Sequence, residues 1–181
     1  MTVAIRTPQL LLREWRDDDV EPFAAMSADP EVMAHLPALP DRDAAATWIV
    51  RMKAHFVENG FAYWAVELPN ETPFIGAVGL TVVRFPAPFT PAVEVGWRLA
   101  RSYWGRGLAT EAARAAIDDG FFRLGLTEIV AFTAPENRRS WRVMERLGMT
   151  RDPAEDFDFP HYPEGDPRRL AILYRLRRPA P

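Results

Sequence analysis

Arg101-Ser-Tyr-Trp-Gly-Arg-Gly-Leu-Ala-Thr110 is the stretch of this sequence that decides the fold. It follows a run typical of a β-strand, Ala92 to Leu99, and it precedes a helical pattern from Ala109 to Leu124. Glycines just before a helix let the backbone turn with its N–H groups exposed, and the helix N-terminus adds about half a positive charge. With Arg101 and Arg106 beside these groups, the segment predicts a site for a diphosphate.

Other interpretations of this segment are a tight loop with solvated arginines or a different phosphate motif. A P-loop requires a lysine after its last glycine, but the only lysine, Lys53, lies on another predicted helix. The dinucleotide fingerprint requires a third small residue where Thr110 stands, within a parallel βαβ unit, whereas here antiparallel strands come first. Both of these motifs fit poorly.

Strands and helices around this segment are predicted from hydrophobic spacing, caps and turn residues. The predicted strands are Gln9 to Trp15, Phe61 to Leu68, Phe74 to Phe85, Ala92 to Leu99, Glu128 to Thr133 and Arg169 to Arg177, and a long loop covers Pro153 to Pro167. Helices are predicted after Asp17 to Asp19, from Asp29-Pro30, from Asp41 to Asn59, from Ala109 to Leu124 and from Asn137 to Leu147. We therefore expect an α/β (α+β) fold of order βααβββαβαββ, with a mixed, mostly antiparallel sheet and helices on both faces.

Composition predicts one globular domain over residues 1–181, because 48% of the residues are hydrophobic and 26% are charged. Lysine and arginine (22) nearly balance aspartate and glutamate (25), which argues against a nucleic-acid surface. We find neither a signal-peptide pattern nor an apolar run near the roughly 18 residues of a membrane span. These features predict a cytoplasmic protein without membrane contact.

The absence of cysteine excludes a thiolate metal site and a cysteine acyl-enzyme. His35, His55 and His161 lack metal-ligand spacing, so no metal is expected, and His55 is predicted to lie on a helix surface. None of the serines lies in a G-x-S-x-G motif, which leaves a serine hydrolase without support. Trp15, Trp48, Trp64 and Trp141 are interpreted as core residues.

The sequence resembles the GNAT superfamily and, within it, the branch of the ribosomal-protein N-terminal acetyltransferases RimJ and RimL. The family's cofactor motif is [QR]-x-x-G-x-[GA], and Trp104-Gly-Arg-Gly-Leu-Ala109 matches it except that Trp104 replaces Gln or Arg, as is usual in this branch. The resemblance extends to four more segments, which occur in the family's order: Thr7 to Trp15, Glu94 to Trp97, Pro135 to Ser140 and Leu173 to Leu176.

This resemblance implies an acetyl-CoA site in a cleft where the strand ending at Leu99 diverges from the strand starting at Glu128. Backbone groups of Trp97 to Leu99 would pair with the pantetheine arm like an added strand. The expected cofactor-binding residues are Trp97, Arg98, Leu99, Arg101, Trp104, Gly105, Arg106, Gly107, Leu108, Ala109, Thr110, Asn137 and Ser140.

The expected catalytic residues are Glu94 and Ser140. Glu94 would act as a base, through water, on the incoming ammonium group, and its alternative role is a hydrogen-bonded strand carboxylate. Ser140 matches the serine that in this branch protonates the leaving sulfur, and its alternative role is a helix cap. Many family members carry a tyrosine donor seven residues after the position of Asn137, but here that residue is Met144.

The amine acceptor is expected to contact Asp156, Asp158 and His161 in the long loop, although charged loop residues are usually just solvated. The missing tyrosine leaves open a binding module that has lost catalysis, and a phosphate-ligand binder outside CoA chemistry is a weaker alternative. Whether the acceptor is a protein N-terminus or a small amine stays open, as does a homodimer.

Overall fold

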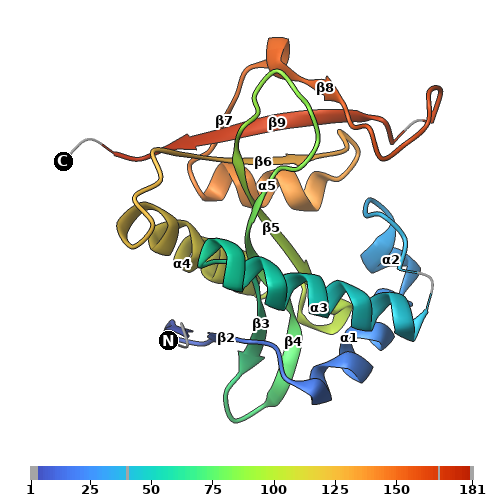
Figure 1. Cartoon of the computed structure of the whole chain (residues 1–181), viewed down its shortest axis with the longest axis vertical. Helices are drawn as coiled ribbons and strands as arrows, with labels where there is room; N and C mark the ends of the chain where they lie inside the picture. The colour runs from blue at the N-terminus through green and yellow to red at the C-terminus, as the bar shows by residue number, and fades with distance from the viewer. Residues whose placement is uncertain (1–3, 40, 167, 180–181) are drawn as a thin grey trace.

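One sheet runs through the molecule, and helices cover both of its faces (Figure 1). The computed structural model describes residues 4–39, 41–166 and 168–179. This arrangement confirms the predicted α/β class with a mixed, mostly antiparallel sheet.

The strands are β1 Ile5–Arg6, β2 Leu11–Arg13, β3 Tyr63–Leu68, β4 Thr72–Val82, β5 Val93–Leu99, β6 Glu128–Thr133, β7 Thr150–Arg151, β8 Phe157–Asp158 and β9 Leu170–Arg177. The α-helices are α1 Val20–Ser27, α2 Pro30–Met33, α3 Arg42–Asn59, α4 Leu108–Phe122 and α5 Arg138–Arg146. Short 3₁₀ helices are η1 Asp17–Asp19, η2 Arg101–Tyr103 and η3 Pro153–Glu155.

The sheet has a divergence at its centre that positions the functional site. Its strand order is β1-β2-β3-β4-β5-β6-β9-β7, with β8 also paired to β9. Only β5 and β6 run parallel, and among the described residues they share a single register pair, Glu94 with Val130. Beyond Glu94, β5 stays on β4 while β6 continues with β9, so the two halves separate.

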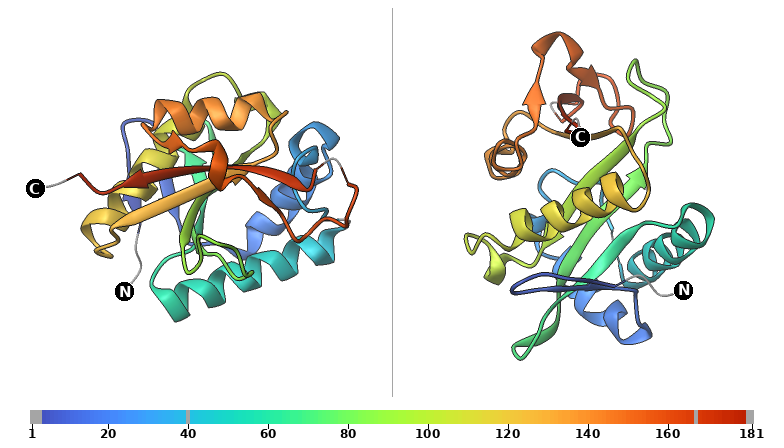
Figure 2. Two further views of the ribbon diagram at one scale, coloured as in Figure 1. Left: turned by 90° about the horizontal axis from the view of Figure 1, so that it is seen from above. Right: turned by 90° about the vertical axis from the view of Figure 1, so that its left-hand side faces the viewer.

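The two faces of the sheet have separate cores. Trp15, Phe23 and Ile49 form one core with α1 and α3, whereas Ala112, Ala113 and Ala116 bring α4 against the opposite face. The views in Figure 2 show α3 and α4 on opposite sides of the strands. Of the predicted core tryptophans, Trp15 and Trp64 are buried, and Trp48 and Trp141 are partly buried at the core edges.

Two sequence predictions are wrong. His55 is not on the surface: it is 5% exposed, its Nε2 accepts a hydrogen bond from the Val82 N–H at 3.1 Å, and its Nδ1 lies 2.7 Å from the Phe61 carbonyl oxygen. The predicted loop Pro153 to Pro167 contains η3 and β8 within its described part, because β9 offers a free edge to which Phe157 and Asp158 pair.

Candidate active site

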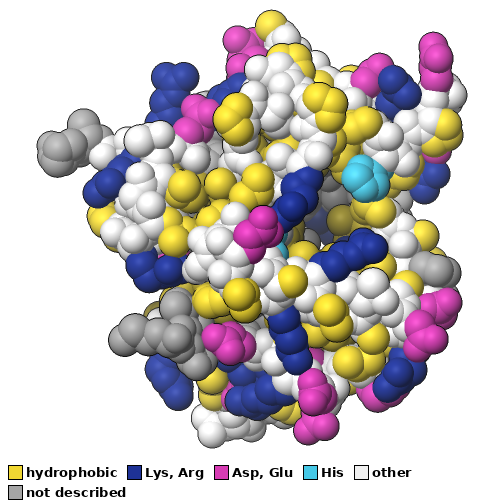
Figure 3. Space-filling model, viewed as in Figure 1, with side chains coloured by type: hydrophobic (Ala, Val, Ile, Leu, Met, Phe, Trp, Pro, Cys, Tyr) yellow, Lys and Arg dark blue, Asp and Glu magenta, His cyan; other side chains and the backbone are white. Residues whose placement is uncertain are grey.

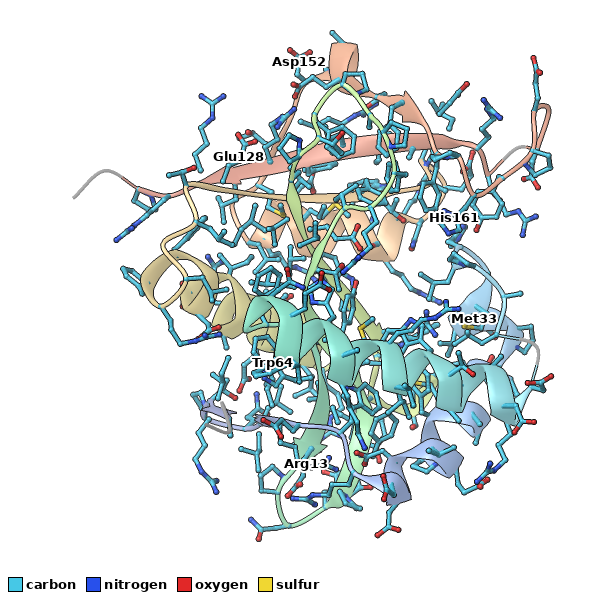
Figure 4. All side chains as sticks on the ribbon, in the orientation of Figure 1. Arg13, Met33, Trp64, Glu128, Asp152 and His161 are labelled. Atoms are coloured by element: carbon cyan, nitrogen blue, oxygen red, sulfur yellow. The ribbon has the colours of Figure 1, made fainter. Side chains whose placement is uncertain are left out.

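The divergence of β5 and β6 opens a cavity of about 1250 Å³ that is lined from both halves of the molecule. Figure 3 shows the surface hollowed between the β6–β9 half and the α3 half. In Figure 4, His161 lies on the upper side of this opening and Met33 on the α2 side. The cavity is therefore placed where two reactants could approach from opposite faces of the sheet.

The glycine loop lies along the α4 side of the cavity. Gly105 and Gly107 have φ angles of +77° and +80°, which L-residues with side chains rarely adopt, and nothing lies within 4 Å of a Cβ added to either. Gly107 is the N-cap of α4 and offers no side chain to its amides. The N–H groups of Leu108, Ala109 and Thr110 have no recorded acceptor among the described residues, so they are available to an anion.

Arg101 and Arg106 do not point into this cavity. Arg101 pairs with Glu31 at 2.6 Å and with Asp29 at 3.5 Å, and Arg106 makes a two-pronged pair with Glu71 at 3.0 and 3.1 Å. Neither arginine lines the cavity, because acidic residues distant in sequence hold both guanidinium groups. Their role as cofactor ligands stays a prediction that this geometry does not favour.

Positive charge comes instead from α5, which the sequence analysis missed. Arg138, Arg142 and Arg146 line the cavity and follow one another at four-residue spacing, so they share one face of the helix. Arg139 also lines the cavity and lies with its guanidinium carbon 4.5 Å from the centre of the Trp104 ring. The i, i+4 spacing of arginines after Asn137 was a signal for this site in the sequence.

The β5 edge beyond Glu94 borders the same cavity through Trp97, Arg98 and Leu99. These residues pair with β4 on one side only, which leaves the other edge of the strand without a strand partner among the described residues. The Leu99 carbonyl accepts a hydrogen bond from the Trp104 indole N–H at 2.8 Å, so this part of the edge is already used. The remaining edge offers the geometry for an extended ligand.

Asn137 and Ser140 come together at the start of α5. The Asn137 side chain accepts from the Ser140 N–H at 3.3 Å as the helix cap, and its amide donates to the Thr133 hydroxyl at 2.9 Å. Both side chains line the cavity, and no hydrogen bond of the Ser140 hydroxyl is recorded among the described residues. Capping is thus done by Asn137, and the Ser140 hydroxyl is left available.

Glu94 lines the cavity where β5 parts from β6. Burial raises its pKa to about 7, and a hydrogen bond at 3.0 Å from the Thr81 hydroxyl partly offsets that rise. Thr81 is the cross-strand partner of Glu94 in the β4–β5 register. A carboxyl with such a pKa can exchange protons near neutral pH, as a general base requires.

Tyr63 is a second residue that the sequence analysis missed. It lines the cavity, and a Cβ added to Gly96 would lie 1.7 Å from its hydroxyl oxygen, so Gly96 makes room for this ring. Burial, followed by the negative charge of Glu94, raises the pKa of Tyr63 well above its usual range. A glycine inside a strand, two residues after Glu94, was the sequence signal for such a close approach.

Of the three predicted acceptor residues, only His161 reaches the cavity. It stacks on Phe159, with ring centroids 4.9 Å apart. Asp156 pairs with Arg151 and accepts a hydrogen bond from the Leu173 N–H at 3.3 Å, while Asp158 pairs with Arg169 at 3.0 Å. Nearby arginines thus hold both carboxylates away from the cavity.

Comparison with known proteins decides the family. The family described as acetyltransferase (GNAT) domain matches residues 9–150. This chain belongs to the GNAT acetyltransferases. It is therefore an acyltransferase, and its relatives include YnaD of Bacillus subtilis, an uncharacterized N-acetyltransferase that is 31% identical over 150 residues, or 82% of this chain and 83% of YnaD.

Solved structures agree with this assignment. An acetyltransferase from Agrobacterium tumefaciens is 28% identical with a TM-score of 0.78, covering 97% of this chain and 95% of that one. RimJ from Mycobacterium smegmatis, in complex with CoA-disulfide, shares the fold with a TM-score of 0.76 at 19% identity, covering 97% and 86% of the two chains.

The residues present suit the acetyl-CoA that GNAT enzymes bind. Unpaired amides at α4, arginines on α5 and an open strand edge lie around one cavity, as an extended ligand with phosphates would require. Within the described residues no group of His, Asp or Glu side chains is arranged to hold a metal ion. In the same part of the chain, none of the helices has the length and apolar character needed to cross a membrane.

Proposed function

We propose that this chain transfers the acetyl group of acetyl-CoA to a primary amine by direct attack in a ternary complex. The observation that carries the proposal is that Glu94 and Ser140 line the same cavity, although they come from opposite sides of the β5–β6 divergence. The acceptor would enter from the α3 side, where Glu94 meets it, and the donor from the α4–α5 side.

In this mechanism acetyl-CoA supplies an activated acetyl thioester. The amides of Leu108 to Thr110 and the arginines of α5 hold its phosphates, and the free edge of Trp97 to Leu99 aligns its extended arm. Asn137, fixed by Thr133 and by the cap, orients the arm beside Ser140. Holding both reactants in one geometry supplies much of the rate.

Proton transfers are assigned to Glu94 and Ser140. Glu94 takes the proton of the incoming ammonium through water, since a carboxylate with a pKa near 7 is ionised in a useful fraction at neutral pH. As the C–N bond forms and the C–S bond breaks, Ser140 donates its hydroxyl proton to the departing sulfur. The second proton that the attacking nitrogen loses on becoming an amide returns to the Ser140 oxygen through water, so the serine is regenerated. Met144, buried at the position where many relatives have tyrosine, has no proton to donate.

Several finer assignments rest on the same proposal. The Trp-Gly-Arg-Gly form of the cofactor loop and the fold shared with RimJ support the branch of ribosomal-protein N-terminal acetyltransferases. The continuous sheet supports one domain over residues 1–181, and we expect it to act in the cytoplasm without nucleic acid or membrane. Whether it acts as a homodimer is decided by measuring its mass in solution.

The test is an acceptor screen that follows release of free thiol from acetyl-CoA, with peptides, amino acids and polyamines as acceptors and an enzyme-free control. Transfer to one class of primary amine is the expected result. Tight acetyl-CoA binding without transfer to any amine would contradict the proposal and favour the acyl-CoA-binding module that Met144 suggests.

Gly107→Val is expected to abolish the stabilisation of the fold by acetyl-CoA. Acetyl-CoA at a hundredfold excess over Kd should stabilise the wild type by about 2.7 kcal/mol, measured as a rise in Tm, whereas adenine dinucleotides should act much less. A side chain at residue 107 would project into the open space of the loop and strain its φ of +80°.

Gly125→Val is the matched control, because Gly125 also has a positive φ of +72° and open space around its Cβ, but it does not line the cavity. It should lose stability without losing the acetyl-CoA response. An equal acetyl-CoA response in both variants would show that the loop does not bind the donor.

Initial-rate kinetics are expected to give intersecting patterns for donor and acceptor. The sequence contains no cysteine, so no thiol can carry an acetyl group between two half-reactions. Parallel lines, together with an acetylated protein that turns over at the catalytic rate, would replace the ternary complex by a covalent intermediate.

A further inference from the structure

Arg98 is a half-buried arginine whose side chain has no acidic partner among the described residues. It leaves β5 on the same face as Glu94 and Gly96, since alternate residues of a strand share a face. Its guanidinium carbon lies 5.6 Å from the ring centre of Phe23 on α1 and 5.7 Å from that of Trp48 on α3. These rings support the group without neutralising its charge.

The guanidinium also has only one hydrogen-bond acceptor among the described residues. It has five N–H donors. Among the described residues they make one hydrogen bond, to the Ser27 hydroxyl at 3.5 Å, which is the outer limit for such a bond. Burial lowers the pKa of Arg98 to about 10, with the nearby Tyr63 opposing that shift. The charge is thus partly desolvated and open to a further partner.

Arg13 shows what this chain does with another embedded arginine. Both of its terminal nitrogens lie 2.8 Å from the Asp19 carboxylate, and its Nε lies 2.9 Å from Glu67. Those two carboxylates raise the pKa of Arg13 in spite of its burial. The contrast indicates that the missing carboxylate of Arg98 comes from outside the chain.

Arg98 is on the acceptor side of the cavity. It lines the cavity together with Trp48, Tyr63 and Glu94, on the face covered by α1 and α3. Val95 and Leu99, which alternate with it along β5, pack on the opposite face with α4. The groups proposed to bind the donor phosphates lie on that opposite face. The Arg98 side chain is therefore free to contact the acceptor.

We propose that Arg98 binds a carboxylate of the acceptor, so that the substrate is a primary amine that also carries a carboxylate. A guanidinium fork matches a carboxylate in a two-pronged pair, and the aromatic rings on α1 and α3 hold the fork in place. The proposal rests on the amine acetylation proposed above and names the class of acceptor.

The spacing along β5 adds a constraint on this acceptor. Glu94 and Arg98 are four residues apart on one strand face, which separates their Cα atoms by about 13 Å. The Tyr63 hydroxyl lies between them, against Gly96. A carboxylate at Arg98 and an amine that reaches Glu94 through water therefore need several bonds between them, as in a peptide N-terminus followed by an acidic residue or in an extended amino acid.

The test compares acceptors that differ only in carboxylate against carboxamide. One pair is an extended amino acid, with several bonds between its amine and its carboxylate, and the corresponding amide. The other pair is a dipeptide amide with Asp or Asn as its second residue, so that free amino acids and acidic peptides are distinguished. The wild type should prefer the carboxylate member of at least one pair by about 10- to 100-fold in kcat/KM. Arg98→Gln should reduce that ratio to near one, whereas Arg98→Lys should keep part of it, because a lysine provides charge without the fork.

Arg177→Gln is the control, since Arg177 is 83% exposed on β9 and pairs with Glu128 far from the cavity lining. It should leave the preference unchanged. Arg98→Gln must also keep a cooperative melting transition. An equal loss of kcat/KM on both members of each pair would overturn the proposal and reduce Arg98 to a packing residue on Phe23 and Trp48.

A binding measurement keeps the proposal testable if none of these acceptors is acetylated. N-acetylated versions of the four compounds are added to the CoA-loaded protein, and the rise in Tm is recorded. A larger rise for the carboxylates that is lost in Arg98→Gln supports the carboxylate site even where the proposed transfer fails. No preference of the wild type for carboxylates, in transfer or in binding, overturns it.

Discussion

Glu94→Gln is expected to lower kcat/KM at pH 7 by about 100-fold, the lower end of the range for loss of a general base. Glutamine fills nearly the same space and can still accept the Thr81 hydrogen bond, but it cannot take a proton. The measurement is a pH profile of kcat/KM on an acceptor identified in the thiol-release screen.

The sign of the pH dependence follows from the raised pKa. Since burial raises the pKa of Glu94 to about 7, its basic form appears as the pH rises through 7, and wild-type kcat/KM should rise over that range. The variant should rise only with deprotonation of the acceptor itself, near 10.4 for a lysine-like amine and about 7.7 to 8.0 for an α-amine. The deficit should thus be largest at low pH and narrow at high pH.

Thr81→Val tests the same assignment from the partner of Glu94. The Thr81 hydroxyl lowers the pKa of Glu94, so its removal should raise that pKa further and shift the rising limb to higher pH while the plateau is kept. Glu58→Gln is the control, because Glu58 is exposed and does not line the cavity. A wild-type profile in both Glu94→Gln and Thr81→Val would remove Glu94 from the mechanism.

Stability provides an independent readout of the raised pKa. Between the usual value of 4.5 and about 7, the unfolded state releases the Glu94 proton while the folded state keeps it. The free energy of unfolding should therefore fall as the pH rises through that window, and this contribution should be absent from Glu94→Gln. Urea titrations at several pH values measure the difference.

Local signals were sufficient to predict the fold. The sequence predicts a helix from Asp41 to Asn59, and in the structure Asp41 caps α3 through the Ala44 N–H at 2.8 Å while Gly60 ends it with a φ of +77°. The predicted strand runs became β3, β4 and β5, each paired antiparallel with its neighbour along the chain. Such features depend on residues close in sequence, which is why spacing alone could predict them.

Side-chain partners distant in sequence could not be predicted in this way. Glu31 and Glu71, far from the cofactor loop in sequence, hold Arg101 and Arg106 outside the cavity. His55 is buried because β4 supplies a backbone N–H to its ring, and no feature of α3 itself indicated that contact. The arginines of α5 and the Tyr63–Gly96 contact did leave signals in the sequence, but only the structure placed them around one cavity.

Ser140→Ala is expected to lower kcat by roughly 10- to 1000-fold, toward the smaller figure because a thiolate leaves more readily than an alkoxide. The side chain of Asn137, not that of Ser140, caps α5. The Ser140 hydroxyl makes no hydrogen bond with the other described residues. Removal of the hydroxyl should therefore leave the free energy of unfolding within about 0.5 kcal/mol of the wild type. Acetyl-CoA affinity, measured by calorimetry, should barely change.

Ser102→Ala is the matched control, since Ser102 is an exposed serine on η2 that does not line this cavity. It should retain wild-type kcat, and Ser140→Thr should recover part of the rate lost in Ser140→Ala if the hydroxyl donates the proton. A fall in acetyl-CoA affinity that accounts for the whole loss would assign Ser140 to binding of the donor. Full kcat in Ser140→Ala would show that thiolate departure needs no acid from the protein. The alignment of donor and acceptor between β5 and β6 would then be the main source of the rate.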